Sequence, residues 1–479
     1  MNFEVVIGIE IHCELKTATK MFSGSKVGFN DEPNTNVNEI DLGMPGTLPS
    51  LNKRAVEQAL KACHIFNMHI DQLLRFDRKC YFYPDLTKGY QITQNEFPIG
   101  TNGYIEIDMA DYKKKINIDK VVIEEDTAKL SHFNDYTLID YNRCGTPLIE
   151  IISDASLRSA QEAAKYVNTL KTMLVYADIS DAKMEEGSLR CDVNISLRPF
   201  GSEEYGVKTE IKNLNSISNI EKAIDFEVQR QSKILLSNEM MVSETRRFDE
   251  TLKETVMMRR KDGVIDYRFH SEPNIVPTLI ASELVAKVKN EIPLMPAQLL
   301  EKYLNTYHLN KVDANIIIND QDLAAYFNEA CSYSNNYQKI ANWLISEVLA
   351  YLNKNDLNIK EMALKPAALT HMLDLNDEGL ISSKQLKQIF ALVNETNNTD
   401  IDQIIKEHNM MMISDEKSIL HFIHQVMAEN AQSVADFQNG NERALKHLLG
   451  QIMKVSQGQV NPKITNQLLI KELNKNNVI

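Results

Sequence analysis

The 479-residue sequence lacks the marks of a membrane or secreted protein. It has no apolar run of about 18 residues or more, which a membrane-spanning helix would need. Its start, MNFEVVIG, is already an alternating strand pattern, so no signal peptide is visible. The six cysteines include no CxxC pair, which favours buried free thiols in a reducing cytosol. We therefore expect a cytoplasmic protein without a membrane partner.

The familiar motifs of nucleotide binding and hydrolysis are also missing. No GxxxxGK[ST] loop occurs, no GxGxxG follows a strand, and neither HExxH nor GxSxG is found. Any ATP site would therefore be built on a different surface. The net charge of −14 argues against a nonspecific nucleic-acid coat. Residues 406–479 are nearly neutral, with eight basic and seven acidic side chains, which fits contact with a polyanion at limited places.

What the sequence does have begins with an alternating strand over residues 3–15. Three isoleucines fall on one face: Ile7, Ile9 and Ile11. Glu10 and His12 fall on the other face, two residues apart, as ligand-type groups on a strand would. A half-exposed strand with ordinary surface residues explains this pattern about equally well.

A second unusual stretch, residues 121–152, reads VVIEEDTAKLSHFNDYTLIDYNRCGTPLIEII. It opens with the run Glu124, Glu125 and Asp126, and it ends with Glu150 inside an apolar segment. A carboxylate with such neighbours must be paired, bound to a metal ion or shifted in pKa. We interpret this stretch and the first strand as two halves of one site.

Basic and aromatic groups interleave in the segment FDRKCYFYPDLTKGYQITQ, residues 76–94. Arg78, Lys79 and Tyr81 lie within four positions of one another, a mixture that suits a phosphate or nucleotide ligand. An exposed hairpin with a few aromatic residues is an equally good interpretation from the pattern alone.

At least four expected strands present a charged face. Residues 184–197 place Arg190 on such a face, and Lys208 and Lys212 share one in VKTEIKNLNS. An antiparallel sheet with one solvated face is the simple explanation. The mixture of carboxylates, His, Arg and Lys is also what a metal- and phosphate-handling surface needs. Phosphoryl transfer, acyl or amide chemistry and a purely structural metal site all remain open here.

The character of the chain changes past Pro293, where strand patterns and charged clusters disappear and helical patterns begin. Near residue 405 a last helical module begins. We therefore expect three domains: 1–292 with most of the sheet, 293–405 helical, and a small helical tail over 406–479.

Several long strings together resemble one known family, the B subunits of the aspartyl/glutamyl-tRNA amidotransferases. They include IGIEIHCEL, DRKCYFYPDLTKGYQITQ, DYNRCGTPLIEI, MEEGSLRCDVNIS and GQIMKVSQGQVNPKITNQLL, in the family's order and over nearly the whole chain. The resemblance implies an α+β fold with a mainly antiparallel-sheet cradle domain, followed by an all-helical domain and a small tail that binds tRNA.

The resemblance also implies an activity. Family members are ligases that use ATP to phosphorylate the side-chain carboxylate of misacylated Glu-tRNA(Gln) or Asp-tRNA(Asn). Ammonia then displaces the phosphate and gives Gln-tRNA or Asn-tRNA. A separate amidase (A) subunit supplies the ammonia, and a small C subunit completes a heterotrimer. The sequence does not decide between the two tRNA substrates.

Carried over by position, the family's Mg²⁺ ligands fall on Glu10, His12, Glu125 and Glu150, and Lys79 falls on a basic catalytic residue. Glu124 and Asp126 are further candidates in or just behind this ligand set. The residues expected near ATP are Arg78, Lys79, Tyr81, Arg190, Lys208 and Lys212. Many members carry zinc-binding cysteines in the first long loop. No zinc is expected here, because those positions are Ser23, Ser25, Asn38 and Asp41.

Two other classes of function compete with this expectation. The chain could be a tRNA-binding scaffold that positions substrate for the amidase, or an unrelated metal-dependent hydrolase. The carboxylates predicted to gather at one site argue against a scaffold, which needs no such cluster.

Overall fold

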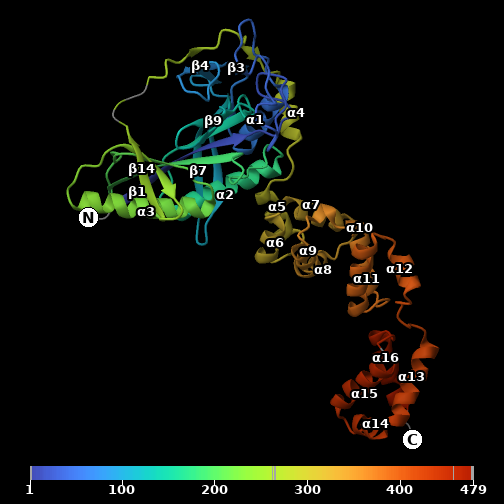
Figure 1. Cartoon of the computed structure of the whole chain (residues 1–479). Helices are drawn as coiled ribbons and strands as arrows, with labels where there is room; N and C mark the ends of the chain where they lie inside the picture. The colour runs from blue at the N-terminus through green and yellow to red at the C-terminus, as the bar shows by residue number, and fades with distance from the viewer. Residues whose placement is uncertain (1–2, 262, 264–265, 457, 476–479) are drawn as a thin grey trace. The chain divides into compact units, whose positions relative to one another are not determined.

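The computed structural model describes residues 3–261, 263, 266–456 and 458–475 (Figure 1). The chain divides after Pro296 into a sheet-rich unit and a helical unit. This arrangement confirms the predicted α+β class, whereas the predicted domain boundary at residue 292 stays a prediction. The further division at residue 405 stays a prediction.

A nine-stranded sheet forms the centre of the first unit. Its order is β14-β13-β12-β11-β1-β10-β7-β6-β2, and every neighbouring pair is antiparallel except β12 and β13. The strands are β1 (Phe3–Glu14), β2 (His69–Ile70), β6 (Gly100–Asp108), β7 (Lys113–Glu125), β10 (Pro147–Ser153), β11 (Leu189–Pro199), β12 (Thr209–Lys212), β13 (Glu244–Asp249) and β14 (Glu254–Arg260). Strands far apart in the sequence, β1, β10 and β11, are thus neighbours at its middle.

Helices cover only one face of this sheet. They are α1 (Lys53–Ile65), α2 (Ala160–Tyr176) and α3 (Ile217–Leu236), and Figure 1 shows α2 and α3 running beneath the strands. Ile7, Ile9 and Ile11 are fully or almost fully buried in the shared core. Each buried isoleucine contributes roughly 1.5–3 kcal/mol, so this face fixes the strand register. The opposite face carries the polar residues.

The start of α2 differs in part from its sequence pattern. Ser159 and Glu162 predict a reciprocal capping box. The Ser159 side chain accepts a hydrogen bond from the Glu162 backbone N–H at 3.1 Å, as expected. The Glu162 carboxylate instead accepts from the backbone N–H of Arg158 at 2.7 Å and from Lys114 Nζ at 2.7 Å. The glutamate therefore ties the helix start to β7.

Short strands form three further sheets in the first unit. Strands β4 (Asp77–Cys80), β5 (Tyr90–Thr93) and β15 (His270–Ser271) make one, β3 (Leu73–Leu74) and β16 (Thr278–Leu279) a second, and β8 (Lys129–His132) and β9 (Thr137–Asp140) a hairpin. The side chain of Gln91 in β5 donates to the backbone oxygen of Glu125 at 2.8 Å. This bond connects the β4–β5 sheet with the end of β7.

The second unit is all helical in its described part. Its helices, with α4 before the boundary, are α4 (Ser282–Asn290), α5 (Pro296–Asn305), α6 (Lys311–Ile318), α7 (Gln321–Tyr333), α8 (Tyr337–Trp343), α9 (Leu349–Asn355), α10 (Pro366–Asp377), α11 (Ser383–Thr396), α12 (Ile401–Glu407), α13 (Glu416–Glu429), α14 (Ala431–Gln438), α15 (Glu442–Val455) and α16 (Pro462–Lys475). A π-helical segment, Leu344–Val348, lies between α8 and α9. Among the described residues, no helix is long and apolar enough to cross a membrane.

Candidate active site

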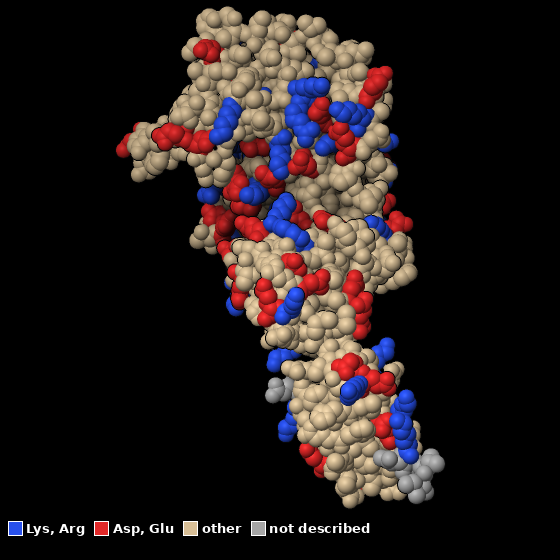
Figure 2. Space-filling view, turned by 90° about the vertical axis from the view of Figure 1, so that its right-hand side faces the viewer, with Lys and Arg blue, Asp and Glu red and all other residues tan. Residues whose placement is uncertain are grey.

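Four ionisable side chains converge on the open face of the sheet. His12 pairs with Glu150 in the register of β1 and β10, which brings the two stretches singled out from the sequence together. From His12 Nε2, the nearest carboxylate oxygens are those of Glu124 at 3.4 Å, Glu150 at 3.7 Å and Glu10 at 3.8 Å. Figure 2 shows acidic and basic side chains interleaved on one face of the molecule.

The electrostatics of this carboxylate cluster indicate negative charge without a counterion. Burial, and then the negative charge of Glu150, raise the pKa of Glu10 to about 7. Burial also raises the pKa of Glu124 to about 7, and that of Glu150 above its ordinary value. Burial and the nearby Arg190 lower the pKa of His12 to about 3, so the imidazole is neutral. No described Lys or Arg lies within ion-pairing distance of the three carboxylates.

The donor set of the cluster fits a divalent cation. One ligand atom from each of Glu10, His12 and Glu150 lies within 4.8 Å of the others. Carboxylate oxygens and a neutral imidazole nitrogen are metal ligands, and a cation between them would offset the charge repulsion that burial intensifies. Magnesium prefers oxygen donors, so His12 is the least favourable member of the set.

Asp126 and Arg190 lie at the edge of the cluster. Arg190 pairs with His12 in the strand register, and its Nη2 donates to Asp126 Oδ2 at 2.6 Å. Arg143 Nε lies 3.5 Å from the same oxygen. The Nε of Arg190 is buried without a hydrogen-bond partner. Asp126 therefore orients a guanidinium that still has an unused donor beside His12.

The basic and aromatic residues of β4 separate into two roles. The charge of Lys79 acts on His12, Glu124 and Glu150, so this lysine lies near the cluster, 4.9 Å from the ring centroid of Tyr267. Tyr81 packs edge-on to the same ring at 6.0 Å.

The Arg78 side chain pairs with a carboxylate outside the cluster. It donates to both carboxylate oxygens of Glu272, at 2.6 and 3.0 Å, and its guanidinium lies over the ring of Tyr90. The Glu272 side chain is fully buried. The predicted nucleotide role of Arg78 is thus not supported by its contacts, which hold β15 against β4.

Lys212 and Lys208 also differ from each other. Lys212 Nζ lies 2.5 Å from Asp192 and 3.4 Å from Glu210, on the strands that continue the polar face. Burial alone would lower the pKa of Lys212, but the Asp192 carboxylate raises it above the ordinary value. Lys208 precedes β12 and is exposed. Lys212 therefore lies within the strand and pairs with carboxylates there, whereas Lys208 lies just outside it.

Comparison with known proteins gives the chain its family. Residues 5–286 match the family described as GatB/GatE catalytic domain, and residues 325–473 match the one described as GatB domain. The chain belongs to the GatB/GatE family. The B subunit of aspartyl/glutamyl-tRNA(Asn/Gln) amidotransferase from Oceanobacillus iheyensis is 48% identical over 475 residues, covering 99% of this chain and 100% of that protein. The proteins of the same name from Mesoplasma florum and Mycoplasma mycoides subsp. mycoides are 47% and 46% identical, covering 98% and 99% of both chains.

In this GatB/GatE family member, Glu125 does not join the carboxylate cluster. Both of its oxygens accept from Lys88 Nζ, at 2.5 and 2.7 Å, and one also accepts from the backbone N–H of Ile92 at 3.0 Å. Successive strand residues point to opposite faces, and Glu150 pairs with Val122 of β7. Glu124, two residues on, therefore shares the open face with Glu150, whereas Glu125, the expected ligand, faces Lys88.

Lys88 is one of the basic residues of the segment 76–94, but the sequence did not assign it to the site. It lies among turn-type residues between β4 and β5, where a lysine is ordinarily solvated. In the structure only 11% of its side chain is exposed. Burial lowers the pKa of Lys88, but the paired Glu125 raises it above the ordinary value. The family member thus buries an ion pair directly behind the cluster.

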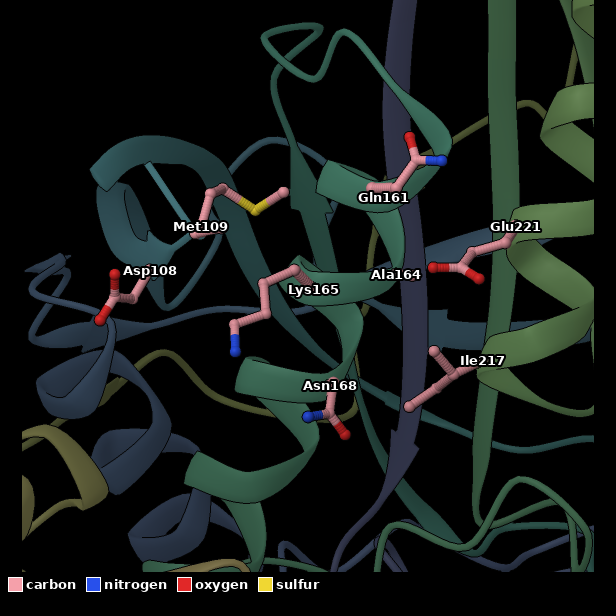
Figure 3. A pocket seen from close by; sticks show the side chains of 9 residues that line it. Asp108, Met109, Gln161, Ala164, Lys165, Asn168, Ile217 and Glu221 are labelled. Atoms are coloured by element: carbon pink, nitrogen blue, oxygen red, sulfur yellow. The ribbon is translucent and has the colours of Figure 1, made fainter. Parts of the chain in front are cut away.

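A separate hollow of about 360 Å³ lies on the helix-covered side of the sheet (Figure 3). Asp108 comes from the end of β6, Lys165 and Asn168 from α2, and Glu221 from α3. None of the residues singled out from the sequence lines it. The candidate active site is therefore the open polar face and not this hollow.

Proposed function

We propose that this chain is the catalytic B subunit of a glutamine-dependent tRNA amidotransferase. It would phosphorylate the side-chain carboxylate of misacylated Glu-tRNA(Gln), Asp-tRNA(Asn) or both with ATP, and then direct ammonia to the activated acid. The observation that carries the proposal is the uncompensated cluster of Glu10, Glu124 and Glu150 around a neutral His12, in a chain of the GatB/GatE family.

The cluster would hold Mg²⁺ through Glu10, His12, Glu150 and Glu124. Bound there, the ion would neutralise phosphate charge and align the transferred group with the attacking carboxylate oxygen. The protein's own cationic residues supply the remaining stabilisation of phosphate charge. A carboxylate is a poor acyl donor because oxide is a poor leaving group, and phosphorylation replaces oxide with phosphate.

Cationic side chains beside the cluster would bind the phosphate oxygens. Lys79 already acts on the cluster through its charge, and Arg190 has an Nε donor without a partner. In this proposal both would lie where negative charge develops during transfer, an arrangement that stabilises such a transition state. Lys212 would require displacement from Asp192 to take part, so we assign it a lesser role.

The partners are part of the proposal. Free ammonia must reach the activated acid unprotonated, which requires a path closed to water. We therefore propose an amidase subunit that releases ammonia and a small third subunit that joins the two. The relatives are named as one subunit of an amidotransferase, which supports an assembly of several chains. Misacylated tRNA is the proposed macromolecular substrate.

We infer that the first long loop needs no zinc. Ser23 Oγ donates to Asp41 Oδ1 at 2.6 Å, and Lys20 Nζ lies 3.3 Å from Asp41 Oδ2. The backbone N–H of Asp41 donates to Asn38 Oδ1 at 3.2 Å. These positions offer no thiolate and bind one another, so the donor set does not fit a structural zinc ion.

The test is an amidation assay on the chain assembled with its amidase and small subunits. Glu10→Gln should lower ATP-dependent phosphorylation of Glu-tRNA and Asp-tRNA at least about 100-fold, because one ligand charge is lost. Glu106→Gln, an exposed glutamate of β6, is the matched control and should leave the rate unchanged. Unchanged phosphorylation with Glu10→Gln would favour a scaffold that only positions tRNA.

A further inference from the structure

Lys79 differs from the other basic side chains in and around the candidate active site in what holds it. Most of the others pair with a carboxylate: Arg78 with Glu272, Lys88 with Glu125, Arg190 with Asp126 and Lys212 with Asp192. No described residue accepts a hydrogen bond from the Lys79 ammonium or forms an ion pair with it. This ammonium lies instead over the ring of Tyr267, whose centroid is 4.9 Å away.

Tyr267 reaches Lys79 through the pairing of remote segments. Strand β15 pairs with β4, with His270 opposite Arg78. Just before β15, the backbone oxygen of Tyr267 accepts a hydrogen bond from the backbone N–H of Cys80 at 2.9 Å. Cys80 directly follows Lys79 in β4. The main chain therefore fixes the tyrosine beside the lysine.

The surroundings of Tyr267 also hold its ring. The next residue, Arg268, has a φ of 47°, a left-handed conformation that is disfavoured for a residue with a Cβ. The Arg268 backbone N–H donates to Asp266 Oδ1 at 2.8 Å, which stabilises this turn. Tyr81 and Phe269 both meet the Tyr267 ring edge-on, with centroids 6.0 and 6.1 Å away. Backbone strain of this kind is found where the structure needs one particular placement of a side chain.

An aromatic ring holds an ammonium group in a different way from a carboxylate. The face of the ring attracts the cation through its quadrupole, more strongly where water is partly excluded. Both Lys79 and Tyr267 are partly buried. The ring brings no negative charge and no strong acceptor, so the three N–H donors of Lys79 stay available to a ligand. A carboxylate in the same place would compete with phosphate for these donors.

The charge of Lys79 acts on the carboxylate cluster. Burial raises the pKa of Glu124 to about 7, and the charge of Lys79 is the strongest of the influences that lower it. Burial and the charge of Glu124 raise the pKa of Glu150, which Lys79 also lowers. A phosphate group bound at the cluster would therefore meet the Lys79 ammonium.

We propose that Tyr267 is a positioning residue for phosphoryl transfer: its ring holds the Lys79 ammonium beside the cluster and leaves it free to bind the transferred phosphate. The inference rests on the proposed function for the reaction, whereas the contact between the two side chains does not depend on it. A lysine loses rotamer freedom when it binds phosphate, and a ring that already restrains it reduces that loss. Tyr267 acts through Lys79 and touches no substrate.

The first measurement follows the contact without any reaction. The lysines of the full chain are dimethylated with isotope-labelled formaldehyde, and the Lys79 methyl signal is assigned by its absence in Lys79→Arg. The electrons of an aromatic ring shift protons above its face upfield. The Lys79 signal should therefore lie upfield of those of exposed lysines in wild type and in Tyr267→Phe, which keeps the ring. In Tyr267→Leu this upfield shift should be lost.

The matched control is Tyr104→Leu. Tyr104 is also partly buried, and its ring lies 3.8 Å from the ammonium of Lys115. It pairs with Asn117, toward the other end of β7 from Glu124. This variant should leave the Lys79 signal and the phosphorylation rate unchanged. If Tyr267→Leu lowers the urea midpoint, Tyr267→Met, whose flexible side chain fills irregular space, should still show the loss of the upfield shift.

The second measurement is ATP-dependent phosphorylation of misacylated tRNA by the assembled enzyme. Tyr267→Leu should lower kcat about five- to thirtyfold, as expected for the loss of a partly desolvated cation–π contact. The KM for ATP should stay within about twofold of wild type, because Lys79 meets the transferred phosphate mainly in the transition state. Tyr267→Phe should match wild type. In a Lys79→Met background, Tyr267→Leu should cause no further loss, since both changes remove one interaction.

Two results would overturn the proposal. An unmoved Lys79 signal in Tyr267→Leu would show that the ring does not hold the ammonium. An equal loss of rate from Tyr267→Leu with and without Lys79 would show that the ring contacts a substrate, and a raised KM for ATP or for tRNA would identify which one. If the wild-type complex phosphorylates neither misacylated tRNA, the proposed function fails, and the methyl signal still decides whether Tyr267 holds Lys79.

Discussion

The sheet-rich unit contains two groups of buried or partly buried carboxylates with opposite electrostatics. Glu227 of α3, with a side chain fully buried, is surrounded by donors: Arg230 Nε at 2.8 Å, Arg246 Nε at 3.1 Å, Thr255 Oγ1 at 2.6 Å and Gln231 Nε2 at 3.0 Å. Burial raises its pKa, but the Arg230 hydrogen bond and the other donors lower it below the ordinary value overall. In the carboxylate cluster on the open face, by contrast, the pKa values of Glu10, Glu124 and Glu150 are raised.

The comparison shows that burial of a charge does not by itself mark a functional site. What differs is whether the protein supplies the counter-charge. The Glu227 side chain has two arginines, and it joins α3 to β13 and β14. Among the described residues, only a neutral histidine lies within ion-pairing distance of the cluster carboxylates, so much of their charge is left to be balanced by something that binds. A protein tolerates such uncompensated charge at sites where it serves binding or catalysis.

The largest effect on stability should come from removing Glu227, the carboxylate whose charge is balanced by arginines. Glu227→Ala removes one of the two carboxylates that pair with Arg230 and Arg246 and leaves them Glu244 alone. Removing one partner of a buried ion pair costs about 3–5 kcal/mol. Urea unfolding of the variant would measure the loss. Glu254→Ala, an exposed glutamate of β14, should change the free energy of unfolding by less than about 0.5 kcal/mol. A loss below about 1 kcal/mol for Glu227→Ala would mean that Glu244 alone satisfies the two arginines.

A substitution in the carboxylate cluster should have the opposite effect: it should spare stability and lower activity. Glu150→Gln removes one of three mutually repelling carboxylates, so the free energy of unfolding should stay the same or rise slightly. Phosphorylation of the tRNA-borne acid should nevertheless fall about 100- to 1,000-fold, because a ligand charge is lost from the transition state. Urea unfolding and single-turnover phosphorylation on the same preparation would check both parts. A stability loss like that of Glu227→Ala would make the cluster structural.

A smaller effect, on cation affinity, should distinguish the neighbouring carboxylates Glu124 and Glu125. Glu124→Gln should weaken Mn²⁺ binding, followed by electron paramagnetic resonance, about tenfold or more. Glu125→Gln should keep the cation and lower its affinity less, because Glu125 contacts Lys88 and acts only by positioning β7. Lys88→Met combined with Glu125→Gln should be no worse than either change alone, since both remove one interaction. Loss of the cation with Glu125→Gln but not with Lys88→Met would make Glu125 a ligand after all.

Alternation in the sequence was enough to predict the two-faced sheet and half of the cluster. Ile9 and Glu10 had to point to opposite faces, and the buried setting of Glu150 marked it from its apolar neighbours alone. A run of carboxylates cannot be resolved in this way. Glu124 and Glu125 are adjacent and chemically alike, and only the pairing of Glu150 with Val122 decides which of them faces His12.

The remaining differences arise from partners that are remote in the sequence. Arg78 looked available for phosphate because its carboxylate, Glu272, lies 194 residues away. The Glu227 network was invisible because acidic and basic residues on a helix ordinarily face solvent. In each case local pattern gives the side chain's chemistry, but tertiary structure decides whether that chemistry is already satisfied.

The smallest expected effect concerns pH. The pKa of Glu227 is lowered in the folded state, so its stabilising contribution is complete above its ordinary value of 4.5 and is lost as pH falls through the folded-state pKa. The urea midpoint of wild type should therefore fall more steeply between about pH 5 and pH 3 than that of Glu227→Gln, which has no proton to gain. Groups remote from Glu227 and its arginines titrate alike in both proteins and cancel in the difference. Parallel curves would mean that the arginines do not hold this carboxylate ionised, and the contrast with the cluster would then rest on geometry alone.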